Sequence, residues 1–260
     1  MSKPRPMPLL DGEEEIPPHL VLGQSLATFP SRRLAALLQG WSVLIGLGIL
    51  LNFALQEVTA VWVSMVVVFG MGGLGLVIGW RVLHLWNREV ILFERGFTFR
   101  EGSAAIPFQY REIKAIKLQA EQLAYFGGLL RRRVYLITLT TRAGDTLIMN
   151  NVYQNIESLA DKLPAAVNAS LRLTLEETLA RNETMPFGDA LQMAANGLST
   201  PERPPLLWTD FGGYRIANRQ IHLLHADQQV WASFVLADVE NLMLLVEVLR
   251  ERHTVGERAG

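Results

Sequence analysis

Cysteine is absent from this chain of 260 residues, which excludes disulfides, iron–sulfur clusters and thiolate zinc sites. The lack of disulfides fits a reducing compartment for any part of the chain that contacts water. An excess of one charge is lacking too: the formal net charge is −1 at pH 7, so composition predicts no general affinity for nucleic acid. Because 50% of the residues are hydrophobic, composition does not indicate disorder either.

Catalytic and metal-binding motifs are also lacking. The chain contains no GxSxG, no HExxH and no phosphate-binding loop. His222 and His225 have a spacing that suits a metal on a helix, but on the strand expected there they would lie on opposite faces. We therefore predict no cofactor, no metal site and no enzymatic activity.

Ionised side chains are scarcest in residues 34–80, where Glu57 is the only one. A helix needs about 20 apolar residues to cross the hydrocarbon of a bilayer, so this tract is long enough for a pair. Polarity rises at residues 56–59. We predict a transmembrane helical hairpin over residues 34–87, with helices at about 37–56 and 60–80. The alternative is a buried helical hairpin inside a soluble protein.

Basic residues predict the orientation of this hairpin. Arg32 and Arg33 precede the first helix, Arg81 and Arg88 follow the second, and the connection carries neither Lys nor Arg. By the positive-inside rule, both termini of a multi-pass cell-membrane protein would then be cytoplasmic.

Glycines are frequent in the second predicted helix. Residues 70–75 match GxGxxG, but a dinucleotide-binding loop needs a preceding strand and an aqueous ligand, so we reject that reading. Gly75 and Gly79 form a GxxxG pair, which lets helix backbones approach closely. We expect this pair to pack the two helices together, with a homodimer as the alternative.

Residues 1–33 are rich in proline and contain an acidic run at 13–15, which is typical of a flexible cytosolic tail. Residues 20–30, at its end, would lie along the membrane or the soluble part.

Beyond residue 88, short strands and a capped helix occur in the same order twice. Glycine turns at 95–96 and 196–197 correspond, and so do two steps in which an aromatic precedes an acid by two residues, Tyr110 before Glu112 and Trp208 before Asp210. This internal repeat predicts a first unit with a connecting helix at 88–182, a second at 183–252, and a tail at 253–260.

These features resemble the pleckstrin-homology-like (PH-like) modules of bacterial membrane proteins. With the preceding hairpin, the chain resembles an uncharacterised bacterial membrane-protein family of unknown function. The resemblance implies an α+β membrane protein: a two-helix transmembrane hairpin plus cytosolic PH-like antiparallel β units, each closed by a helix. The second unit looks shorter than a full seven-stranded barrel, so two separate domains and one shared sheet both stay open.

A basic, partly aromatic segment is the candidate contact for lipid or partner. It contains Tyr125, Phe126, Arg131, Arg132 and Arg133, and each basic group near an anionic membrane surface contributes about 1 kcal/mol. Lys114 and Lys117 belong to the same unit and would share its face only if a β-bulge intervenes. The alternatives are solvated arginines beside a hairpin loop, or docking onto the more acidic part of the chain after residue 182.

The function expected from the sequence is a membrane-anchored, non-enzymatic binding module that recognises protein or anionic lipid headgroups at the cytosolic membrane face. The expected partners are the lipid bilayer and another membrane protein, and nucleic acid is not among them. The alternative is an accessory subunit of a membrane transporter or envelope-assembly complex.

Overall fold

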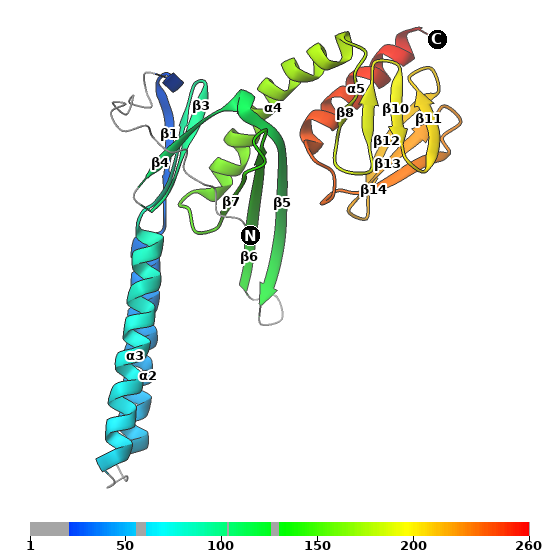
Figure 1. Cartoon of the computed structure of the whole chain (residues 1–260). Helices are drawn as coiled ribbons and strands as arrows, with labels where there is room; N and C mark the ends of the chain where they lie inside the picture. The colour runs from blue at the N-terminus through cyan, green and yellow to red at the C-terminus, as the bar shows by residue number, and fades with distance from the viewer. Residues whose placement is uncertain (1–20, 56–60, 103, 126–129, 260) are drawn as a thin grey trace. The chain divides into compact units, whose positions relative to one another are not determined.

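The computed structural model describes residues 21–55, 61–102, 104–125 and 130–259 (Figure 1). These residues divide into two compact units. The first, called here the hairpin unit, contains residues 21–107 and Val152–Asn155. The second, called the groove unit, contains Phe108–Asn151 and the described residues from Ile156 onward.

Two long apolar helices dominate the hairpin unit, α2 (Arg33–Leu55) and α3 (Val61–Trp86), and Figure 1 shows them side by side. α2 begins before the predicted residue 37, and α3 continues past the predicted residue 80. Both are long and apolar enough to cross a membrane, and none of the residues in their most apolar windows, Arg33–Phe53 and Met65–His84, is buried.

The close contact between these helices lies at Gly40. A Cβ atom added to Gly40 would come within 2.5 Å of the Ile78 Cγ2 atom, whereas one added to Gly75 or Gly79 would meet nothing within 4 Å. Among the glycines of these two helices, Gly40 makes the tightest approach to the facing helix, and no such approach occurs at Gly75 or Gly79. Those two glycines lie on an open face of α3.

A four-stranded antiparallel sheet, in the order β1-β2-β3-β4, adjoins the helices; its strands are β1 (Ser25–Pro30), β2 (Arg88–Phe93), β3 (Gly96–Glu101) and β4 (Ala105–Gln109). β1 corrects the expectation of a flexible tail up to residue 33. It pairs with β2 from Ser25 opposite Phe93 to Pro30 opposite Glu89, and Phe29 is buried. The burial of Phe29 and the ladder hydrogen bonds offset the entropy lost in ordering this segment.

Polar and aromatic side chains gather where the helices meet this sheet. The Arg33 guanidinium lies 5.7 Å from the centroid of the Trp86 ring, and Arg88 forms an ion pair with Glu101. Tyr153 is fully buried, and its pKa is raised above the ordinary value by loss of hydration, with Arg88 lowering it and Glu101 raising it. The helices therefore end in a packed, charged junction.

The groove unit contains three further antiparallel sheets and two helices. The first sheet, β5-β6-β7, consists of β5 (Ile113–Tyr125), β6 (Leu130–Thr141) and β7 (Thr146–Asn150). A 3-10 turn (Tyr110–Glu112) precedes it, and helix α4 (Ile156–Ala180) follows it.

Helix α4 packs along this sheet through one apolar face. Ile156, Leu159, Leu163 and Val167 are buried at helical spacing, as the sequence pattern predicts. Pro164 lies buried inside the helix without ending it, although its ring removes one backbone hydrogen bond and crowds the preceding turn.

The remaining strands form two sheets, β11-β10-β9-β8 and β12-β13-β14, followed by helix α5 (Leu242–Ala259). Their bounds are β8 (Met185–Pro186), β9 (Gln192–Ala194), β10 (Gly197–Thr200), β11 (Arg203–Leu207), β12 (Phe211–Ala217), β13 (Gln220–His225) and β14 (Val230–Val235). The second predicted unit, after residue 182, therefore contains seven strands, whereas the sequence pattern suggests a unit shorter than a seven-stranded barrel. Among the described residues, the fold is α+β with four separate antiparallel sheets.

Candidate functional site

The basic segment predicted as a contact surface lies on a long hairpin. Arg131, Arg132 and Arg133 begin β6 and pair with Ala124, Leu123 and Gln122 of β5. The third strand, β7, pairs with β6 only from Leu136 onward, so the arginines lie where the sheet has two strands.

Of the other members of that prediction, Tyr125 pairs with Leu130 beside the arginines, whereas Lys114 and Lys117 lie at the far end of β5. Phe126 lies outside the described residues, whereas Tyr125 ends β5. A register shift between Ile113 and Ala115 supplies a bulge beside Lys114, whose side chain is exposed. Lys117 forms an ion pair with Glu240, with 3.5 Å between Nζ and Oε1, so its charge is already partnered.

The two histidines singled out by spacing, His222 and His225, both lie on strand β13. His222 lies on β13 with its Nδ1 atom 2.7 Å from the Ser233 hydroxyl of β14. Within the part of the chain that the structure describes, no cluster of three or more His, Asp or Glu side chains could hold a metal ion.

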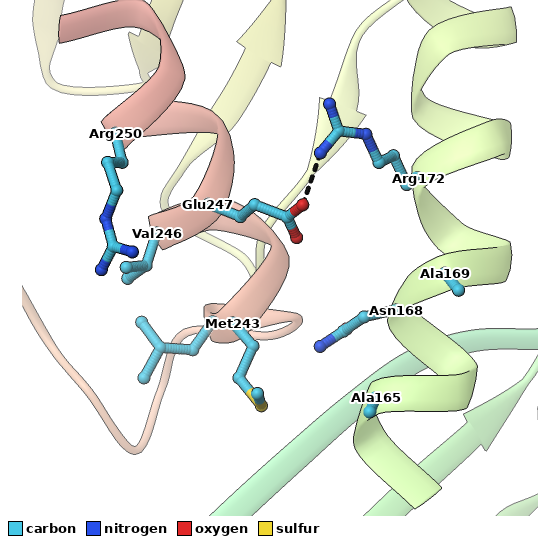
Figure 2. A pocket seen from close by; sticks show the side chains of 9 residues that line it. Ala165, Asn168, Ala169, Arg172, Met243, Val246, Glu247 and Arg250 are labelled. Carbon is cyan, nitrogen blue, oxygen red and sulfur yellow. Dashed lines mark hydrogen bonds and ion pairs between the residues drawn. The ribbon is translucent and has the colours of Figure 1, made fainter. Parts of the chain in front are cut away.

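A groove between α4 and α5 is the site that sequence reasoning missed. It has a volume of about 670 Å³. Figure 2 shows side chains from both helices around it. Its wall on α4 consists of Ala165, Asn168, Ala169 and Arg172, and its wall on α5 consists of Leu242, Met243, Val246, Glu247 and Arg250. The lining is thus largely apolar with polar groups at defined places, as in many ligand sites.

Asn241 positions α5 beside α4 by docking on the edge of β5. Its side-chain oxygen accepts a hydrogen bond from the Ile116 backbone N–H at 2.9 Å, and its amide nitrogen donates to the Lys114 carbonyl at 3.4 Å. Its own backbone N–H donates to the Ile116 carbonyl at 2.9 Å. Asn241 therefore binds this strand edge as a neighbouring strand would.

Arg172 closes one end of the groove. Its guanidinium binds both carboxylate oxygens of Glu251, at 2.8 and 2.9 Å, and also pairs with Glu247 and Glu176. The hydrogen bonds that Arg172 donates to Glu251, and then to Glu176, raise the pKa of Arg172 above its ordinary value. Figure 2 shows the contact between Arg172 and Glu247, which joins α4 to α5.

Two groups in the groove lack partners. Asn168 is 7% exposed, and its side-chain oxygen is buried without a hydrogen bond to any described residue. Its amide points from α4 into the space between the helices (Figure 2). Arg250, exposed beside Val246 on α5, makes no ion pair with the described residues.

The sequence carried only a weak signal for this site. Asn168 follows the buried Val167 and precedes the buried Leu171, where an apolar residue would have been expected from the helical pattern. Helix α5, which forms the other wall, lies far from α4 in the sequence. The groove therefore depends on tertiary contacts that the hydrophobic periodicity of the sequence does not predict.

Comparison with known proteins identifies the family of this chain. No curated protein matches the chain. A model of a protein family of unknown function, DUF6585, matches residues 17–257, which include β1, both apolar helices, the strands of the groove unit, α4 and all but the last two residues of α5. The chain belongs to the DUF6585 family of unknown function.

Proposed function

We propose that this chain is a membrane-anchored, non-enzymatic binding module that recognises protein or anionic lipid at the cytosolic face of the cell membrane. The observation that carries the proposal is the exposure of α2 and α3. Trp62, Phe69 and Leu76 are 70%, 78% and 78% exposed, like many other large apolar side chains of these helices. Leaving one such side chain in water costs about 1.5–3 kcal/mol, so a bilayer is the favourable surrounding.

The charges at the helix ends support the cytoplasmic placement of both termini. Arg33 begins α2, and Arg81 and Arg88 lie toward the same end of the hairpin, on either side of Trp86 in the sequence, whose ring faces Arg33. Indole rings favour the membrane interface, and arginines favour its cytoplasmic side.

The arrangement of strands supports PH-like modules. Four strands, three strands and a helix follow one another as β1–β4, β5–β7 and α4, and again as β8–β11, β12–β14 and α5. Seven antiparallel strands with a closing helix are the pattern of a PH-like unit, and such units bind lipids or proteins. This recurrence also favours the internal repeat inferred from the sequence.

An accessory subunit of a larger membrane complex is the second candidate. It is favoured by one open face of α3, on which Cβ atoms added to Gly72, Gly75 or Gly79 would meet nothing within 4 Å. Small residues of this kind let another membrane helix approach closely. Purification in mild detergent separates the candidates, because a subunit would bring stoichiometric partners with it.

The proposed recognition of anionic lipid by the basic hairpin can be tested on the full chain. A single cysteine at Leu130, carrying an environment-sensitive fluorophore, reports the surroundings of the basic hairpin in vesicles. We expect a blue shift in phosphatidylglycerol vesicles relative to phosphatidylcholine vesicles, lost when Arg131, Arg132 and Arg133 are changed to Ala. Changing the exposed Arg215 and Arg219 of the β12–β13 hairpin to Ala is the control. Equal emission in both vesicles would rule out anionic lipid as the ligand of this hairpin.

A further inference from the structure

We propose that the α4–α5 groove binds an amphipathic α-helix of a partner protein. The helix would place an apolar stripe in the groove, an amide or hydroxyl side chain against Asn168 and a carboxylate against Arg250. This inference rests on the proposed function, since it names the ligand class of a binding module, but the groove unit that carries it is separate from the membrane anchor.

The shape of the groove suits a third helix. Ala165 and Ala169, one turn apart on α4, are exposed and offer almost no side-chain bulk. A helix laid there can approach both α4 and α5, since packed helices lie only about 8–10 Å apart. Met243 on the opposite wall is 51% exposed, and its flexible thioether side chain can adapt to an apolar stripe.

The polarity of the groove floor disfavours a lipid tail. The amide nitrogen of Asn168 points into the space between the helices (Figure 2), and a hydrocarbon chain offers this donor no acceptor. An acyl chain in the groove would bury this amide further without a hydrogen bond, which is unfavourable. A Ser, Asn or Gln side chain on a helix supplies the missing partner.

The charges at the groove end select the sign of the ligand. Glu176, Glu247 and Glu251 surround Arg172 and satisfy it, so this cation is not available. The same carboxylates would repel the phosphate of a lipid headgroup. Arg250 has no described ion-pair partner, and a single carboxylate on the bound helix complements it without crowding the glutamates.

Photocrosslinking in living cells tests the inference on the full chain. Met243→benzoylphenylalanine places a photoreactive group in the groove wall of a chain expressed from its own locus. The matched control is Leu173→benzoylphenylalanine, which lies on α4, is 63% exposed and does not line the groove. We expect irradiation to join position 243, and not position 173, to a peptide with apolar residues at helical spacing and an acidic residue.

Two further variants test whether the adduct depends on the groove. Ala165→Leu combined with Ala169→Leu fills it and should lower the adduct yield about tenfold, as large-for-small changes exclude a packed helix. Arg250→Glu should lower the yield about two- to fivefold, the range for one exposed ion pair, whereas Arg250→Lys should retain it. These positions are exposed, so the melting temperature should stay at the wild-type value.

Several results would overturn the inference. They are a lipid adduct at position 243, a crosslinked peptide without helical amphipathicity, identical adducts from positions 243 and 173, or no adduct. An adduct unchanged by the filled groove would also do so. Fractionation of the same cells tests the anchor independently: a chain that leaves the membrane but keeps its helical adduct would contradict the proposed function and leave this inference standing.

Discussion

Asn241 is the residue on which the docking of α5 depends most. It is 1% exposed, and it binds Lys114 and Ile116 on the edge of β5 through three hydrogen bonds. Its backbone φ of 53° lies in the left-handed region, which asparagine tolerates better than most residues. One residue type thus meets both the backbone and the hydrogen-bond requirement.

Replacing Asn241 separates these two requirements. Asn241→Ala should lower the free energy of unfolding by about 2–4 kcal/mol, because it leaves the Ile116 N–H unpaired and strains the backbone. Asn218→Ala is the control, since Asn218 has a φ of 51° in an exposed turn. It should cost about 1–2 kcal/mol through strain alone. Equal losses in denaturant unfolding of the two variants would contradict the role of the Asn241 amide.

Tyr110 predicts a dependence of stability on alkaline pH. Burial raises its pKa to about 12, above the value of about 10 expected in the unfolded chain. The folded protein therefore holds this proton more tightly than the unfolded chain. Stability from this group is complete below pH 10 and declines as pH rises toward 12.

Melting temperatures measured between pH 9 and pH 12 check this prediction. Tyr110→Phe should flatten the decline, and adding Tyr153→Phe should flatten it further, because burial raises the pKa of Tyr153 in the same direction. If the curves of melting temperature against pH run parallel for the wild type and the variants, Tyr110 does not have a raised pKa. That result would contradict its buried environment.

At the scale of elements, Arg172 joins α4 to α5 through ion pairs with Glu247 and Glu251. Its side chain is 34% exposed, so solvent screens these pairs. Arg172→Ala should lower the free energy of unfolding by about 1 kcal/mol and less at high salt. Arg181→Ala is the matched control, because Arg181 directly follows the same helix and its side chain donates only to the backbone carbonyl of Glu177 among the described residues. If both changes lowered the free energy of unfolding equally, the ion pairs of Arg172 would add nothing to stability.

The α2–α3 hairpin predicts a contrast between its glycines. Gly40→Leu should lower the melting temperature in detergent by several degrees, because even its Cβ atom approaches Ile78. Gly75→Leu and Gly79→Leu should leave it unchanged or raise it, since leucine favours a helix more than glycine and the space is open. If Gly75→Leu or Gly79→Leu lowered the melting temperature more than Gly40→Leu, the GxxxG pair would be the contact between the helices, as expected from the sequence.

Elements with strong local patterns were predictable, and those formed by distant contacts were not. The runs from residue 34 to residue 80 and the apolar face of α4 identified three helices, because hydrophobic length and period are local properties. β1 was missed because its partner β2 lies beyond both apolar helices in the chain. The groove was missed because Asn168 and Met243 become neighbours only after α5 docks on β5. The basic hairpin was found because its arginines are consecutive.

At the scale of the whole molecule, the proposed membrane anchoring depends on the preference of two exposed apolar helices for lipid. The DUF6585 family model includes both of them, together with the strands and helices of the groove unit. Because the chain has no cysteine, single cysteines can be introduced without background labelling. This allows the most direct test of the membrane hairpin.

The decisive measurement is labelling of such cysteines by a membrane-impermeant maleimide in intact cells and in inverted vesicles. We predict that Ser42→Cys in α2 and Phe69→Cys in α3 react only after detergent denaturation, that Thr59→Cys reacts in intact cells, and that Ser2→Cys reacts in inverted vesicles. Reaction of the cysteines at positions 42 and 69 as fast as that at position 2, in a chain that is monodisperse in detergent-free buffer, would contradict the account.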